Sequence, residues 1–270
     1  MVKQLHAALE ECLPFSPQAS VHGFVRERGI VTNAQQHLDR DVVLRVDLRD
    51  FFGSVRSQDL IDSLVELDME PAAAEQVAGL VTVDGKLPQG FSTSPFLSNV
   101  VFDATDKALQ GVVDQKNVTY TRYADDLSFS GNKTDVNDQL LGELAALLAH
   151  RGWQVNDRKT RFMRRGRAQY VTGLSVDDPS GPHVPRVFKR TLRRELYFAR
   201  KHGLADAREH SPKPLSQSQL SGWVEFVGHV EGHRKGALRA AWKEIAPPRV
   251  RAKRESWDDL LEDIGFPEDW

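Results

Sequence analysis

Three aspartates stand where strands are predicted to end. Asp47 directly follows VVLRV (residues 42–46), a short run rich in β-branched residues. Asp125 and Asp126 lie at the centre of VTYTRYADDLSFS (118–130), in which apolar and polar residues alternate on both sides of the pair. This alternation predicts a β-hairpin with the two aspartates at or beside its turn. If the hairpin neighbours the 42–46 strand, three carboxylates converge at one end of a sheet.

Such a cluster has a defined chemistry. Adjacent carboxylates repel each other, so a partly buried pair needs a cation or a raised pKa. Carboxylate oxygens suit Mg²⁺, which shares its ligand shell with water and substrate phosphates. Two such ions can support an in-line phosphoryl displacement. An isolated Asp-Asp pair is more typical of an exposed turn, but Tyr123 and Leu127 indicate a turn anchored in a packed sheet.

The elements around these residues predict a mixed α+β fold. Apolar spacing predicts a helix over Ser57–Leu67, and Pro95 fits the first turn of another. Thr134 is suited to cap a further helix that ends near Gly152. A strand is expected around 169–176, a basic amphipathic helix over 186–202 with Val187, Leu192 and Leu196 on its apolar face, and a helix over 215–230.

Composition places the 270-residue chain among soluble globular proteins, with 40% hydrophobic and 27% charged residues. A single cysteine, Cys12, and no apparent membrane span or secretory signal favour a cytoplasmic location. The net charge of −2 is unevenly distributed along the chain. Residues 1–150 hold 12 Lys and Arg against 22 Asp and Glu, whereas residues 151–210 hold 15 against 6. The second segment could follow a polyanion, although a solvated helix face is the simpler reading of a charge run.

Three motifs resemble, in the correct order, the palm motifs of reverse transcriptases. They are DLRDFF (47–52), LPQGFSTSP (87–95) and YADD (123–126). NAQQH (33–37) is similar to the NAxxH signature of retron reverse transcriptases, and VTG (171–173) is similar to their second signature. The resemblance extends from about Leu5 to about Val230. It implies an RNA-directed DNA polymerase that copies a structured noncoding RNA into RNA-linked DNA.

The resemblance also implies roles for individual residues. Two Mg²⁺ ions would be bound by Asp47, Asp125 and Asp126 together with the Leu48 carbonyl. The resemblance places an aromatic steric gate against ribonucleotides at Phe52. The other residues expected to contact deoxynucleoside triphosphates (dNTPs) are Gln89, Gly90 and Lys159. Each also has a plainer explanation, such as core packing, loop geometry or an exposed lysine.

Residues expected to recognise the cognate RNA fall into two groups. The signature residues are Asn33, His37, Val171, Thr172 and Gly173. The arginines of the basic helix, expected to grip duplex phosphates, are Arg190, Arg193, Arg194 and Arg200. A lone Asn or His more often caps a helix or satisfies a buried polar contact. The other implied partners are the DNA product and an effector protein in antiphage defence.

A right-hand polymerase follows from the resemblance: partial fingers with the NAxxH region (1–41), a palm with an antiparallel sheet (42–176), a helical thumb (177–246) and a tail (247–270). The fingers are expected to be reduced, because only about ten residues precede Cys12. This leaves open a catalytically impaired RNA-binding component, or one needing a separate fingers segment. A group II intron-like enzyme outside the retrons is a further alternative, which NAQQH and VTG disfavour. Paired histidines at 229 and 233 fit surface residues better than a zinc site.

Overall fold

The computed structural model describes residues 2–211, 214–232 and 235–245. Two compact units divide the chain between Thr172 and Gly173, four residues before the expected end of the palm at 176. The predicted tail 247–270 and His233 lie outside the described residues. Within these, no helix is both long and apolar enough to cross a bilayer.

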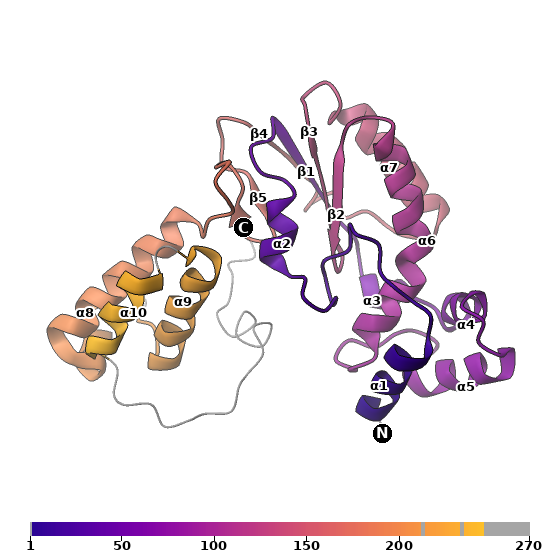
Figure 1. Ribbon diagram of the computed structural model, residues 1–270, viewed down its shortest axis with the longest axis horizontal. Coiled ribbons are helices and arrows are strands. Elements are labelled where there is room, and N and C mark those ends of the chain that lie inside the picture. Colours follow the sequence, from indigo (N-terminus) through magenta and orange to yellow (C-terminus); the bar gives the residue numbers. More distant parts are fainter. Residues whose placement is uncertain (1, 212–213, 233–234, 246–270) are drawn as a thin grey trace. The chain divides into compact units, whose positions relative to one another are not determined.

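A four-stranded antiparallel sheet organises the first unit, in the order β2-β3-β1-β4 (Figure 1). Strand β1 spans Val42–Asp47, as the β-branched run predicts. Strands β2 (Thr119–Tyr123) and β3 (Asp126–Gly131) form the predicted hairpin, and β4 spans Arg161–Arg164. Strand β1 is paired on both sides, which brings Asp47 beside the hairpin.

The two faces of this sheet differ. Figure 1 shows α6 (Ser94–Asp114) and α7 (Asp138–His150) on one face and α2 (Ile30–Gln35) on the other. Alternate residues such as Leu44, Val46, Leu127 and Phe129 belong to the main apolar core. The intervening residues, which include Asp47 and Asp126, therefore point to the opposite face. The remaining helices are α1 (Val2–Cys12), α3 (Phe51–Ser54), α4 (Ser57–Glu66) and α5 (Pro71–Val81).

The predicted cap of one helix and one predicted strand are wrong. Helix α7 is capped by Asn137, whose Oδ1 accepts a hydrogen bond from Leu140 N at 3.0 Å, and not by Thr134. The expected 169–176 strand consists of two short strands, β5 (Tyr170–Val171) and β6 (Leu174–Ser175). Thr172 and Gly173 between them have φ values of +46° and +75°, which no continuous strand accommodates.

The second unit contains α8 (Arg186–His210), α9 (Gln217–Val230) and α10 (Lys235–Ile245), which pack against one another. Phe188 stacks on Trp223 with ring centroids 3.9 Å apart, and Leu192 and Leu196 are buried as predicted. Val187, expected on the apolar face, is exposed, because Phe188 takes the buried position. Helix α8 runs eight residues beyond the predicted end, with a break in helical geometry at Gly203, where φ is +82°.

Candidate active site

The three aspartates meet at the end of the sheet where the hairpin turns. Asp47 and Asp126 are direct partners across the antiparallel pair β1–β3. Asp125 lies in the two-residue turn between β2 and β3, and its carbonyl accepts a hydrogen bond from Leu48 N at 3.0 Å. The predicted convergence of the three residues is therefore present in the backbone pairing itself.

Basic and amide groups surround two of these carboxylates. Arg45 Nε donates to Asp126 Oδ1 at 2.9 Å. Asn156 Nδ2 donates to Asp47 Oδ1 at 2.9 Å, and Lys159 Nζ lies 3.6 Å from Asp47 Oδ2. Lys159 thus lies next to the first aspartate, with most of its side chain exposed, and its contact with nucleotide stays a prediction.

Burial and mutual repulsion shift the acidities of the hairpin pair. Burial, followed by the charge of Asp47, raises the pKa of Asp125. Burial raises the pKa of Asp126 to about 6, with contributions from Asp125 and Asp47, although Arg45 acts in the opposite direction. Such shifts report the cost of burying charged carboxylates close to one another, which a bound cation would relieve.

The carboxylate oxygens of the three aspartates are the type of ligand that a hard divalent cation prefers. Their side chains are, however, not arranged as a closed metal site. Across the described ranges, no group of three or more His, Cys, Asp or Glu side chains is positioned to hold a metal ion. The hydrogen bonds of the carboxylates explain this. Asp126 is turned to Arg45, and Asp47 is held by Asn156.

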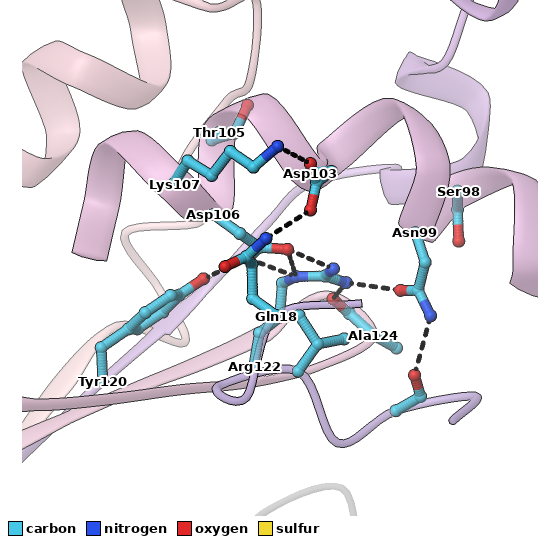
Figure 2. A network of polar contacts seen from close by, with 12 residues as sticks. Gln18, Ser98, Asn99, Asp103, Thr105, Asp106, Lys107, Tyr120, Arg122 and Ala124 are labelled. Carbon is cyan, nitrogen blue, oxygen red and sulfur yellow. Dashed lines mark hydrogen bonds and ion pairs between the residues drawn. The ribbon is translucent and has the colours of Figure 1, made fainter. Parts of the chain in front are cut away.

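A buried polar network lies behind the hairpin (Figure 2). The guanidinium of Arg122 donates to both carboxylate oxygens of Asp106, at 2.7 to 3.2 Å, and both side chains are completely buried. Tyr120 Oη also donates to Asp106, at 2.7 Å. The remaining guanidinium nitrogen donates to Asn99 Oδ1 at 3.1 Å and to the carbonyl of Ala124 at 3.2 Å. Because Ala124 precedes the aspartate pair, the network ties the turn to helix α6.

The predicted nucleotide-binding residues lie on separate elements. Phe52 is half-buried in α3, whereas its neighbour Phe51 belongs to the core. Gln89 and Gly90 are exposed in the loop before α6. Gly90 has φ of +92°, a conformation that favours glycine, so loop geometry alone explains its residue type. Their contact with nucleotide stays a prediction, as does the Leu48 carbonyl as a metal ligand.

The two signature motifs, far apart in the sequence, come together in space. Thr172 Oγ1 donates to the carbonyl of Ile30 at 3.0 Å, which joins the VTG segment to the first residue of α2. Asn33 and Val171 are buried on either side of this junction. Thr172 and Gly173 are partly exposed in the tight turn, so the turn is the accessible part of the motif.

His37 is not available for the direct RNA contact expected from the sequence. Its side chain is fully buried, with Nδ1 2.7 Å from Ser130 Oγ and Nε2 2.7 Å from Thr121 Oγ1. Burial, followed by the charges of His22 and Arg40, lowers the pKa of His37 to about 3. The neutral imidazole of His37 therefore links β2 to β3 through hydrogen bonds, on the sheet face that also carries Asp47 and Asp126. Asn33 and Val171 are likewise too deeply buried to read bases.

The arginines of α8 differ in their contacts. Arg190 and Arg193 are exposed and form no ion pair within the described part of the chain, and they line a shallow groove with Arg186. Arg194 pairs with Glu195 at 3.0 Å, and Arg200 with Glu244 at 3.4 Å. Of the four predicted phosphate-binding arginines, Arg190 and Arg193 therefore present uncompensated charge within the described residues.

Sequence reasoning overlooked Arg45, Asn99, Asp106, Arg122 and Asn156. A signal was present for some of them. Arg45 interrupts an otherwise apolar strand, and Asp106 falls on the same face of α6 as buried Phe102, Leu109 and Val113. A charge at a core position requires a buried partner, which nothing in the sequence identified.

Comparison with known proteins adds to this geometry. A sequence profile described as "Reverse transcriptase (RNA-dependent DNA polymerase)" matches residues 1–197. The chain belongs to the reverse transcriptase family. This confirms the predicted fold class, a right-hand polymerase of mixed helices and antiparallel sheet.

Named relatives specify the type of reverse transcriptase. Retron Mx65 reverse transcriptase of Myxococcus xanthus is 38% identical over 197 residues, covering 66% of this chain and 46% of that protein. Retron Mx162 reverse transcriptase of the same organism is 35% identical over 249 residues, covering 80% and 50%. These matches confirm the retron-type resemblance. The chain spans about half the length of these relatives. A solved telomerase of Candida tropicalis aligns with TM-score 0.48 and 13% identity, covering 65% of this chain and 43% of that one.

Proposed function

We propose that this protein is the RNA-directed DNA polymerase of a retron. The observation that carries the proposal is the in-register pairing of Asp47 with Asp126 and the position of Asp125 in the adjoining turn. Main-chain pairing brings the backbones of the three aspartates together, and carboxylates that converge there on divalent cations would support phosphoryl transfer. Membership in the reverse transcriptase family supports the same reaction, extension of a primer hydroxyl with dNTPs on an RNA template.

Asp47, Asp125 and Asp126 would hold two Mg²⁺ ions, with the Leu48 carbonyl as a further ligand. When bound, such ions lower the cost of charge on the attacking and leaving oxygens. Arg45, paired with Asp126, and Lys159, close to Asp47, neutralise part of the carboxylate charge. Lys159 would also neutralise or protonate departing pyrophosphate. Phe52 would exclude a ribose 2′-hydroxyl, and Gln89 and Gly90 would support the incoming nucleotide.

The partner of the enzyme would be a structured noncoding RNA, copied into branched, RNA-linked single-stranded DNA. The partly exposed turn at Thr172–Gly173 would contact the folded RNA, with buried Asn33 and Val171 supporting the junction beneath it, while His37 acts only by joining β2 to β3. Arg190 and Arg193 would bind the phosphates of the duplex with their unpaired positive charges, assisted by Arg194 and Arg200. A cytoplasmic location and a role in antiphage defence with an effector protein belong to the same proposal.

Isolation of the branched product tests the retron assignment. The gene would be expressed with its adjacent noncoding region, and nucleic acid would be treated with ribonuclease and then with a debranching enzyme. We expect single-stranded DNA whose mobility shifts on debranching and which is missing in an Asp125→Asn strain. DNA synthesis on primed RNA without any branched product would favour a reverse transcriptase outside the retrons. The same pair of strains, challenged with phage, tests the defence role.

A further inference from the structure

Phe24 carries an exposed aromatic ring on a backbone conformation that disfavours it. Its φ is +59°, in the left-handed region that bulky residues rarely adopt. The residue is 41% exposed, so a large part of its ring faces solvent. Strain of this kind persists only where surrounding contacts enforce it, and it clusters at functional sites.

The enforcing contacts come from the network behind the catalytic turn. The carbonyl of Arg122 accepts a hydrogen bond from His22 N at 2.8 Å. Asn99 Nδ2 donates to the carbonyl of Gly23 at 3.0 Å. Oδ1 of the same amide accepts a hydrogen bond from Arg122 (Figure 2). A Cβ on Gly23 would lie 2.4 Å from the backbone nitrogen of Ala124, so glycine permits a close approach to the turn. The residue after Gly23 is thereby held beside the aspartate pair.

The ring of Phe24 contacts the predicted sugar gate. Its centroid lies 6.1 Å from that of Phe52, with the planes inclined by 44°. Phe52 in turn packs on core residue Phe51, with centroids 5.4 Å apart. Phe24 is thus the solvent-facing member of an aromatic row that begins in the core and ends next to the catalytic turn.

We propose that Phe24 is a substrate-binding residue that, with Phe52, forms the apolar wall for the sugar of the incoming dNTP. This rests on the proposed polymerase function. An aromatic face offers the carbon-bound hydrogens of deoxyribose a rigid apolar contact at low entropic cost. The network of Arg122 and Asn99 serves this role by fixing the catalytic turn and the strained backbone of Phe24 in one arrangement.

Steady-state dNTP incorporation on a primed RNA template tests the proposal. Phe24→Ala should raise KM for dNTP by about five- to tenfold, the worth of one aromatic contact, with kcat within about twofold of wild type. Phe24→Tyr, which keeps the ring, should retain the wild-type KM. Leu80→Ala removes a similarly exposed apolar side chain from α5 and is the matched control, with no change expected. Phe52→Ala is the positive control and should admit ribonucleotides.

Thermal unfolding of Phe24→Gly separates a substrate contact from a structural one. Glycine adopts positive φ without strain, so this variant should unfold at a temperature no lower than wild type while its KM rises as in Phe24→Ala. An unchanged KM in Phe24→Ala, with active wild-type enzyme, would overturn the role of Phe24 alone. Earlier unfolding of both variants together with a fall in kcat would also overturn it, in favour of a packing role. No incorporation by wild type would overturn the polymerase proposal and this inference together.

Discussion

At the scale of single residues, the surroundings of Asp126 determine how it can act. The carboxyl is buried opposite Asp47 and next to Asp125, and it has one cationic partner, Arg45. Its pKa of about 6 exceeds the ordinary value of 3.8. Between these two values the folded protein holds a proton that the unfolded chain has released. The free energy of unfolding therefore falls as pH rises through this window. Above about pH 6, where Asp126 is ionised in the folded protein, this loss of stability is complete.

Removing that charge should stabilise the protein while abolishing its proposed chemistry. With metal ions chelated, Asp126→Asn should raise the free energy of unfolding by about 1–3 kcal/mol at pH 8, because an uncharged amide avoids the cost of burying a charge beside two other carboxylates. At pH 4, where wild-type Asp126 is protonated, the gain should vanish. Urea denaturation at both pH values measures this. A variant less stable than wild type at pH 8 would contradict the raised pKa.

His37 has the opposite pH dependence. Burial lowers its pKa from 6.5 to about 3, so between these values the unfolded chain binds a proton that the folded protein does not. The free energy of unfolding should fall on acidification from pH 6.5, with a slope of up to about 1.4 kcal/mol per pH unit from this residue. His37→Gln should lose that part of the slope in urea denaturation at pH 7, 6 and 5. An unchanged slope would show that His37 does not titrate in this way.

At the scale of elements, the hairpin β2–β3 is held from both sides of the sheet. His37 joins its two strands on the face of α2, and Arg122 anchors it to α6 through Asp106 on the other. The turn that carries Asp125 is therefore held by contacts on both faces. A rigid turn is what catalysis by preorganised charge requires.

Loss of the Arg122 anchor should be costly. Arg122→Met leaves the carboxylate of Asp106 buried and without its cation, which should lower the free energy of unfolding by about 3–5 kcal/mol. Arg56→Met is the matched control, since Arg56 pairs with Asp59 at the surface, and its effect should stay below about 1 kcal/mol. Equal effects of the two substitutions in urea denaturation would mean that the buried pair is not an anchor.

Elements with periodic sequence were predictable, and contacts between distant segments were not. The alternation around YADD and the run VVLRV predicted the hairpin, the strand and the meeting of their aspartates. The turn at Thr172 and the burial of His37 depend on partners more than 90 residues away in sequence, at Ile30 and Ser130. Local sequence patterns do not identify such distant partners. His37, whose hydrogen bonds are satisfied in the core, was therefore predicted to contact RNA.

At the scale of the whole molecule, charge is divided between an acidic segment, residues 1–150, which carries the three aspartates, and a basic one, residues 151–210. The excess of Lys and Arg in residues 151–210 includes Arg190 and Arg193, which are exposed on α8. Arginines without ion-pair partners contribute most to polyanion binding, because they neutralise phosphates and release counterions. RNA affinity should therefore depend on these two more than on Arg194 and Arg200, which have carboxylate partners.

Salt dependence tests this distribution. Arg190→Gln combined with Arg193→Gln should weaken binding to duplex RNA and reduce the slope of log affinity against log salt by roughly 1.5. Arg165→Gln is the control, because Arg165 is exposed yet paired with Asp39 and Asp41. A slope that changes equally in both variants, measured by fluorescence anisotropy, would show that α8 is not the RNA-binding face.

The polymerase proposal depends on the three aspartates acting together, and one measurement tests it most directly. Mg²⁺-dependent incorporation of labelled dNTPs on a primed RNA template would be followed for wild type and Asp125→Asn. We expect incorporation by wild type, at least about a thousandfold less by the variant, and equal RNA affinity for both, since the substitution removes charge stabilisation of the transition state. Undiminished incorporation by Asp125→Asn, or none by folded wild type that binds RNA, would contradict the account.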